Sequence, residues 1–241
     1  RLLRTPSFTH NVKQLKAVLV GGSSIPRTII IKAHECGLPL FTTYGLTEMA
    51  SQVTTTRPGD APDRLFTSGQ ALEHRQVKVD RNGEILVKGD TLFRGYVADG
   101  NVSLPLDNDG WFHTGDLGSM DSDGYLTVTG RKDNMFISGG ENIYPEEIEG
   151  TLSLLDGITE ALVVPFEDED FGFRPVAFIR GSGCSRVCKS DLVDSLEKVL
   201  PRFKIPVCFY QWPESGEKPQ IKPSRPYFQE LLKRGELIEI T

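Results

Sequence analysis

A lysine near the C-terminus lies in the proline-rich stretch "GEKPQIKPSRPYFQELL", residues 216–232. The ammonium group of Lys222 is a compact charge that can contact both carboxylate and phosphate oxygens. Pro219 and Pro223 each fix one backbone torsion and so stiffen the chain around this lysine. An apolar helical pattern follows directly and predicts an anchor for the segment. The residues alone leave two interpretations open, a surface cation or a charge presented to a reaction centre.

A second group of chemically capable side chains lies in "TTYGLTEMAS", residues 42–51, directly after a predicted buried strand. The ends of such strands face ligand crevices in α/β proteins. Tyr44, beside Gly45, can stack on a planar ring. Thr47 can donate a hydrogen bond to a phosphate oxygen, and Glu48 can ligate Mg²⁺ through a carboxylate oxygen. The alternative is that Glu48 is only a favourable acid at a helix start. By itself, the motif favours that alternative.

A carboxylate follows a Thr-Gly turn in "WFHTGD", residues 111–116. Asp116 can accept two hydrogen bonds from a ribose diol, as acidic residues do in dinucleotide sites. An aspartate that only closes an Asx-turn explains the pattern equally well. The motif in isolation does not separate the two interpretations.

The densest stretch is "GRKDNMFISGGENIYPEEIE", residues 130–149. Arg131 presents a planar fork of donors that suits hydroxyl or phosphate oxygens. Ser138, Gly139 and Gly140 allow the backbone to approach a ligand closely, because glycine has no side chain. Asp133 lies where the character of the chain changes, and we expect a hinge there. A bulged hairpin accounts for the glycines but not for the whole combination.

The composition excludes several classes of protein. The chain has 241 residues, a formal net charge of −6 and 38% hydrophobic residues, which gives no basic footprint for nucleic acid. No apolar run approaches the roughly 18 residues of a membrane span, and no signal peptide is recognisable after Arg1. The four cysteines match no zinc spacing, so we expect reduced thiols in a cytoplasmic protein. The first residue is not Met, and we expect a piece of a longer protein.

Local patterns predict two different halves. Residues 15–22, 25–37 and 38–45 read as strand, helix and strand, which is typical of α/β proteins. Residues 76–89 alternate around an Asn-Gly pair, a strong hairpin signal, and residues 110–131 continue with antiparallel strands. We therefore predict an α/β fold with a β-rich, barrel-like portion, followed by a small α+β domain. The expected domains are residues 1–132, divided near residue 65, and residues 133–241.

The second half is predicted to alternate helices and strands. Residues 144–155, 189–200 and 226–235 read as helices, and residues 160–166, 174–181 and 207–212 read as strands. Ser190 is the expected N-cap of the middle helix. The last helix is expected to end at Gly235 and to bury an apolar face composed of Tyr227, Phe228, Leu231 and Leu232.

The order of the motifs carries more information than any one of them. "LVGGSSIP", "YGLTE", "WFHTGD", "GRKDNMFISGGENIYPEEIE" and "QIKPSR" together resemble the acyl-adenylate-forming superfamily, which includes acyl-CoA synthetases, adenylation domains and beetle luciferases. The stretches "DEDFGFRPVAFI" and "QIKPSRPYF" most resemble the o-succinylbenzoate–CoA ligases of menaquinone biosynthesis. The superfamily's upstream phosphate loop is absent, so the chain resembles roughly the C-terminal half. We expect little ligase activity from it alone.

The resemblance implies substrates and a role for each motif. ATP, Mg²⁺ and coenzyme A would act on a small carboxylic acid, first forming an acyl-adenylate and then a thioester. Glu48 would hold Mg²⁺, Lys222 and Thr47 would contact the reacting phosphate, and Asp133 would be the hinge of a mobile small domain. The residues implied in nucleotide or CoA binding are Gly21, Gly22, Ser23, Tyr44, Gly45, Asp116, Arg131, Ser138, Gly139 and Gly140.

Other functions stay open within this resemblance. An aryl- or fatty-acyl-CoA ligase and a peptide-synthetase adenylation domain would share every nucleotide motif. A non-enzymatic nucleotide-binding module would not need Lys222 or Asp133, and both are present. The identity of the acid, and whether the protein forms a homo-oligomer, do not follow from these residues.

Overall fold

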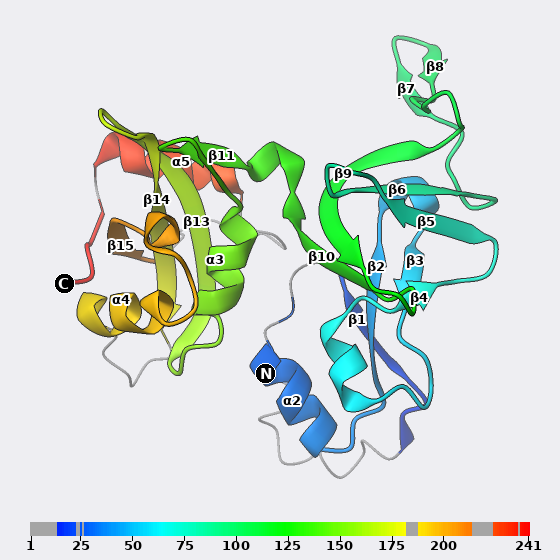
Figure 1. The fold of residues 1–241 in the computed structure, drawn as a ribbon, viewed down its shortest axis with the longest axis horizontal. Coiled ribbons are helices and arrows are strands. Elements are labelled where there is room, and N and C mark those ends of the chain that lie inside the picture. Colours follow the sequence, from blue (N-terminus) through cyan, green and yellow to red (C-terminus); the bar gives the residue numbers. More distant parts are fainter. Residues whose placement is uncertain (1–13, 23–24, 26, 182–187, 214–223, 236) are drawn as a thin grey trace. The chain divides into compact units, whose positions relative to one another are not determined.

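The computed structural model describes residues 14–22, 25, 27–181, 188–213, 224–235 and 237–241. The chain divides into two compact units, Arg1–Lys132 and Asp133–Thr241 (Figure 1). This division falls where the sequence changes character. Each unit buries its own set of apolar side chains.

The first unit begins with the strand–helix–strand arrangement that the sequence predicts. Strand β1 (Val18–Gly21) pairs in parallel with β2 (Leu40–Gly45), and helix α2 (Arg27–Glu35) connects them. Strands β3 (Gln52–Thr55) and β4 (Gln70–Ala71) extend the sheet in the order β1-β2-β3-β4. Side chains along β2 alternate between buried and half-buried positions, as a strand covered on one face requires.

The β-rich part of this unit is an antiparallel sheet in the order β10-β9-β6-β5. The strands are β5 (Arg75–Val79), β6 (Glu84–Gly89), β9 (Phe112–Met120) and β10 (Leu126–Arg131). The predicted turn at Gly83 joins β5 and β6, with φ of 82° at this glycine. The buried side chains of this core are Tyr44, Met49, Val53, Ile85, Val87, Phe112 and Leu126.

A small hairpin extends from the β-rich part (Figure 1). It consists of β7 (Tyr96–Ala98) and β8 (Asn101–Ser103), which pair antiparallel. The described part of the first unit and the boundary also contain short 3₁₀ turns, namely η3 (Thr47–Met49), η4 (Pro62–Phe66) and η5 (Lys132–Asn134). The last of these carries the chain from one unit into the next.

The second unit has a central sheet in the order β13-β14-β15. Strands β13 (Ile158–Asp168) and β14 (Gly172–Gly181) form a long antiparallel hairpin, and β15 (Cys208–Gln211) pairs in parallel with β14. The shorter hairpin of β11 (Phe136–Ser138) and β12 (Glu141–Ile143) precedes this sheet in the chain. The mixed α/β class predicted from the sequence is confirmed.

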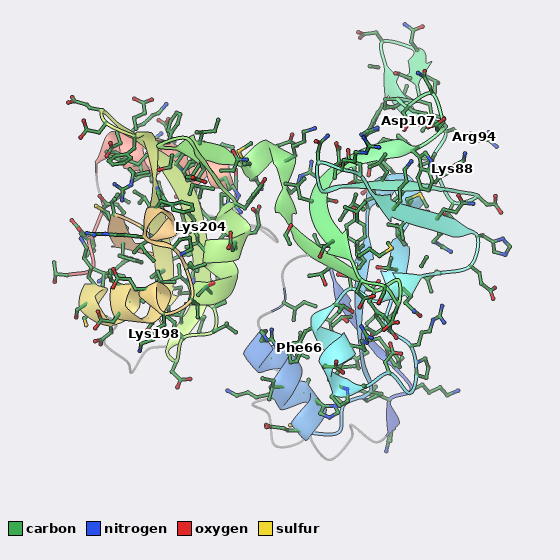
Figure 2. The ribbon with its side chains drawn as sticks, viewed as in Figure 1. Phe66, Lys88, Arg94, Asp107, Lys198 and Lys204 are labelled. Atoms are coloured by element: carbon green, nitrogen blue, oxygen red, sulfur yellow. The ribbon has the colours of Figure 1, made fainter. Side chains whose placement is uncertain are left out.

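Three described α-helices pack on this sheet: α3 (Pro145–Leu152), α4 (Lys189–Glu197) and α5 (Arg225–Arg234). Lys204, in η6 (Arg202–Lys204), binds the Glu147 carboxylate of α3 at 2.6 Å (Figure 2 labels Lys204). The main core of this unit consists of Phe136, Ile143, Ile148, Leu152, Val163, Ala177, Ile179, Leu192, Leu196, Leu200, Ile205, Phe209 and Ile240.

Two sequence-based expectations for these helices are wrong. The N-cap of α4 is Cys188, without a side-chain cap, because the helix begins at Lys189, one residue before Ser190. Tyr227 of α5 is 46% exposed, whereas Phe228 is 3% exposed. Successive helical residues are rotated by about 100° around the helix axis. When Phe228 faces the core, the neighbouring Tyr227 therefore faces solvent. The predicted end at Gly235 is confirmed, with φ of 72°.

Candidate nucleotide site

Three of the predicted site residues from distant parts of the first unit form one hydrogen-bonded chain. The Tyr44 hydroxyl, at the end of β2, donates to Asp116 Oδ2 at 2.6 Å. Arg131 Nη1, at the end of β10, donates to Asp116 Oδ1 at 2.9 Å. Asp116 and Arg131 are direct neighbours in the β9–β10 register. The fold therefore brings together three motifs that the sequence keeps 72 and 15 positions apart.

The electrostatics of this chain fix which group donates. Burial, followed by the charge and hydrogen bond of Asp116, raises the pKa of Tyr44, so the phenol keeps its proton. Tyr44 is 8% exposed, and its ring packs in the core beneath the site. Asp116 thus accepts from donors on both oxygens and holds its carboxylate in one orientation. Stacking of Tyr44 on a base stays a prediction.

The turn that carries Asp116 is held by backbone and side-chain hydrogen bonds. Thr114 Oγ1 donates to the Ile85 carbonyl at 2.7 Å and accepts from the Asp116 N–H at 3.0 Å. Gly115 has φ of 71°, a conformation that glycine adopts without strain. Its N–H donates to Glu84 Oε1 at 3.1 Å. These contacts fix the backbone of the Thr-Gly turn before Asp116. The carboxylate of Asp116 makes none of them and binds Tyr44 and Arg131 instead.

Glu84 is a buried acid that the sequence analysis missed, at 6% exposure. Its Oε2 accepts from Lys132 Nζ at 3.2 Å and lies 3.3 Å from His113 Nδ1. Burial alone would raise the pKa of Glu84, but hydrogen bonds from His113, Lys132 and the Gly115 N–H outweigh it and lower the pKa. A lone acid at the start of the apolar run Ile85–Val87 was the available signal.

A second carboxylate, that of Asp107, lies on the other side of His113 from Glu84. Asp107 Oδ2 lies 3.6 Å from His113 Nε2, and Asp107 Oδ1 accepts the backbone N–H groups of Asp109 and Trp111. Figure 2 labels Asp107 near Lys88, whose Nζ donates to the Asp109 carbonyl at 2.9 Å. Asp107 therefore fixes the turn before β9, and His113 lies between this carboxylate and Glu84.

Glu48 lies in η3 and not in an α-helix. Glu48 is the acid in the first turn of this short 3₁₀ helix, and the described chain passes from Met49 into β3 within a few residues. The Tyr96 hydroxyl donates to Glu48 Oε1 at 2.7 Å, and the Phe93 N–H donates to the Glu48 carbonyl at 2.7 Å. The hydrogen bond to Glu48 is the main cause that raises the pKa of Tyr96.

The oxygen atoms of Glu48 and Thr47 could provide some, but not all, of the ligands of a magnesium ion. A carboxylate oxygen is the ligand that Mg²⁺ prefers, and such an ion commonly completes its shell with water and substrate phosphates. Thr47, beside Glu48, is exposed and offers a hydroxyl oxygen. Across the residues described, no cluster of three or more His, Cys, Asp or Glu side chains has a metal-binding arrangement. The fit is therefore to a substrate-associated ion and not to a protein-only metal cage.

Two predicted glycines near the ends of β1 and β2, Gly21 and Gly45, lie where a larger residue would clash. A Cβ on Gly21 would lie 2.4 Å from the Thr43 carbonyl oxygen, and one on Gly45 would lie 2.1 Å from that of Ser51. Gly22 has φ of 81°. Close backbone packing is thus sufficient to require Gly21 and Gly45. Ser23 and Lys222 lie outside the described residues.

In the second unit, Ser138 is the last residue of β11, and Gly139 and Gly140 form the turn to β12. Gly139 and Gly140 have φ of 58° and 88°, while Ser138 is 2% exposed. Phe171, from the β13–β14 turn, packs on Gly139: its carbonyl accepts the Gly139 N–H at 2.9 Å, and its ring leaves no room for a Cβ there. Asp133 lies in η5 as the first residue of this unit.

Arg225 is a further residue whose partners the sequence did not indicate. Its Nη1 lies 2.6 Å from Glu149 Oε1 and donates to the Val163 carbonyl at 2.5 Å. Its Nη2 donates to Glu149 Oε2 at 3.0 Å and to Glu146 Oε1 at 2.9 Å. The first turn of α5, which follows the Lys222 segment in the chain, is thereby fixed to α3 and β13.

Comparison with known proteins gives the class. Residues 1–97 match the family described as AMP-binding enzyme. A 2-succinylbenzoate–CoA ligase of Oceanobacillus iheyensis is 37% identical over 214 residues, which are 86% of this chain and 44% of that protein. With the ordered motifs, these matches make the chain similar to the AMP-binding enzyme family over residues 1–97 and to 2-succinylbenzoate–CoA ligases over most of its length.

Solved structures of o-succinylbenzoate–CoA synthetases have a fold similar to that of this chain. A variant of E. coli MenE with bound OSB-AMS has a TM-score of 0.79 and 36% identity, covering 92% of this chain and 47% of that chain. The Bacillus subtilis o-succinylbenzoate coenzyme A synthetase in complex with ATP and a magnesium ion has a TM-score of 0.71 and 30% identity, covering 86% and 46%. The chain is similar to 2-succinylbenzoate–CoA ligases, and it spans less than half the length of each of these relatives.

No helix among the described residues is long and apolar enough to cross a membrane. The cysteines within the described ranges, Cys36, Cys188 and Cys208, are unpaired.

Proposed function

We propose that this chain forms the nucleotide-binding and mobile parts of an acid–CoA ligase that converts o-succinylbenzoate, ATP and CoA into the acyl-CoA thioester, AMP and pyrophosphate. The observation that carries the proposal is the hydrogen-bonded chain from Tyr44 through Asp116 to Arg131. It joins three motifs of the AMP-binding family around one carboxylate. The similarity to 2-succinylbenzoate–CoA ligases supports the choice of acid.

Asp116 and Arg131 are the groups that would hold the ribose. The carboxylate of Asp116 accepts from two donors in the structure and retains lone pairs for a diol, because a carboxylate has about four acceptor positions. Arg131 is 45% exposed and so remains available to a ligand oxygen as well as to Asp116. Together they would fix the nucleotide sugar against the edge of the β9–β10 sheet.

In the first half-reaction, a carboxylate oxygen of the acid forms a bond to the α-phosphorus of ATP and pyrophosphate leaves. Two anions meet in this step, so the site must supply positive charge where negative charge gathers. The ammonium group of Lys222 would supply it, and the Thr47 hydroxyl would donate to an α-phosphate oxygen. A magnesium ion held by Glu48 would neutralise charge on the phosphates.

In the second half-reaction, the thiolate sulfur of CoA forms a bond to the acyl carbon and AMP leaves with the bonding electron pair. The Ser138–Gly140 turn would line the approach of the thiol, because glycines leave the path open. We propose that rotation about Asp133 exchanges this turn for Lys222 between the two half-reactions.

ATP and CoA as co-substrates, with unpaired cysteines, also favour the cytoplasm as the location.

The test is a pyrophosphate-release assay on the full-length gene product, with o-succinylbenzoate, benzoates and fatty acids offered in turn. The expected result is magnesium-dependent release that is strongest with o-succinylbenzoate, followed by a thioester when CoA is added. Release with a benzoate or a fatty acid in its place would assign a different acyl-CoA ligase. Nucleotide binding without pyrophosphate release from any acid would overturn the ligase proposal.

A further inference from the structure

We propose that Glu84 is a positioning residue that couples the turn carrying Asp116 to the last residue before the hinge, Lys132. The proposal rests on the function proposed above, because it assigns Asp116 to the ribose and Asp133 to the hinge. No contact with a substrate is assigned to Glu84. It acts through the groups that it holds.

The two oxygens of Glu84 have separate partners. Oε1 accepts the Gly115 N–H at 3.1 Å, one residue before Asp116. Oε2 accepts from Lys132 Nζ at 3.2 Å and faces His113 Nδ1 at 3.3 Å. Because Glu84 is 6% exposed, water has little access to compensate for a lost partner. One buried carboxylate therefore fixes two segments that are 17 positions apart in sequence.

On the turn side, Glu84 supports the orientation of the ribose-binding carboxylate. Gly115 is in the left-handed region, and its N–H points to Glu84 and not into the β9 ladder. Loss of this acceptor would leave a buried N–H without a partner and would allow the turn to shift. The predicted consequence is weaker ATP binding, since Asp116 follows directly.

On the hinge side, the side chains of two consecutive cationic residues form ion pairs within the first unit. Arg131 pairs with Asp116, and Lys132 pairs with Glu84. Both anchors end at Lys132, which is where the first compact unit ends. We therefore expect that Glu84 and Asp116 restrain the chain up to Lys132. Glu84 thus contributes to the position of the pivot through Lys132, next to the ion pair between Arg131 and Asp116.

Three substitutions in the full-length gene product separate the role at the turn from the role at the hinge. Glu84→Gln keeps a carbonyl oxygen that can accept the Gly115 N–H, but it removes the charge that pairs with Lys132. We expect the KM for ATP in the adenylation half-reaction to stay within about twofold of wild type, and the rate of thioester formation from supplied acyl-adenylate to fall about tenfold. Lys132→Met should reproduce that profile. Glu84→Ala should also raise the KM for ATP about tenfold.

A readout without ligase activity keeps this test apart from that of the proposed function. Trypsin cleaves after Lys132, which is 59% exposed in its side chain. Glu84→Gln should raise the rate of that cut about fivefold, because the segment opens more often. Lys198→Met, an exposed lysine of the second unit that Figure 2 labels, is the matched control and should match wild type in both readouts.

The outcomes are distinct. Unchanged cleavage in Glu84→Gln, or thioester formation within twofold of wild type in both Glu84→Gln and Lys132→Met, would overturn the hinge assignment. An unchanged KM for ATP in Glu84→Ala would overturn the turn assignment. Absence of pyrophosphate release from the wild-type protein with every acid would overturn the proposed function, while the cleavage result would still decide whether Glu84 holds Lys132.

Discussion

The guanidinium group of Arg225 binds both carboxylate oxygens of Glu149, at 2.6 and 3.0 Å. Glu149 Oε1 also accepts the Val163 N–H at 2.6 Å, so the acid joins helix α3, strand β13 and the first turn of α5. Both side chains are less than one fifth exposed, at 18% and 17%. Arg225 follows Lys222 by three positions in the sequence, so this ion pair holds the chain shortly after the proposed catalytic lysine.

Arg225→Met in the 241-residue chain should lower the free energy of unfolding by about 3–5 kcal/mol, because it leaves Glu149 buried and unpaired. Urea denaturation at neutral pH measures the loss. The control is Arg234→Met, whose partner Glu230 is more than half exposed, and whose removal should change little. Comparable losses in the two variants would contradict a structural role for the Arg225–Glu149 pair.

Lys222→Ala in the full-length gene product should abolish acyl-adenylate formation and leave thioester formation from supplied acyl-adenylate near the wild-type rate. The reason is that positive charge is needed where carboxylate and phosphate meet, and not where the thiol attacks. The two half-reactions are followed separately, by pyrophosphate release and by thioester yield. Lys218→Ala is the matched control, with both rates retained. Equal loss of both half-reactions in Lys222→Ala would remove Lys222 from its assigned role.

Asp133→Pro should preserve adenylation and suppress thioester formation, because proline fixes φ at the proposed pivot. The measurement is the same pair of half-reactions. Asp133→Ala, which leaves φ free to rotate, is the control and should retain both. Normal transfer to CoA by the proline variant would place the hinge elsewhere.

Tyr44→Phe removes the hydroxyl that orients Asp116 and keeps the ring in the core. We expect the KM for ATP to rise by about fivefold to tenfold and the free energy of unfolding to fall by about 1 kcal/mol, the usual value for one hydrogen bond. Steady-state adenylation kinetics and urea denaturation check the two effects. Tyr227→Phe, on the exposed side of α5, is the control for removal of a phenol hydroxyl. A Tyr44→Phe variant with wild-type KM would leave Arg131 as the sufficient support of Asp116.

The lowered pKa of Glu84 predicts how stability depends on pH. A carboxyl group whose pKa is lower in the folded state binds fewer protons there, so its contribution is present above the ordinary value of 4.5 and is lost as the pH falls through the folded value. The difference in unfolding free energy between wild type and Glu84→Gln should therefore be largest near neutral pH and shrink below about pH 4.5. The groups that face Glu84 are Lys132, His113 and the Gly115 N–H, with Asp107 beyond His113. A difference that grows on acidification would contradict this sign.

Much of the fold follows from local sequence, and particular elements show why. The Asn82-Gly83 pair predicts the β5–β6 hairpin because glycine takes the positive φ that the turn needs. Gly235 ends α5 for the same reason. Two failures were equally local in origin: a helix start displaced by one residue at Ser190, and a helical face drawn too wide at Tyr227.

For the candidate site too, some features follow from the sequence and others only from the tertiary structure. The sequence by itself determined the order of the motifs and the residue types, because glycine turns, acids and cations at fixed local spacings limit what each segment can bind. Only the tertiary structure decided that Tyr44 and Arg131 share Asp116, that Glu84 joins the Asp116 turn to Lys132, and that Arg225 binds Glu149. The physical reason is that burial and ion pairing depend on neighbours that the fold supplies from distant positions, and a short window of sequence does not contain them.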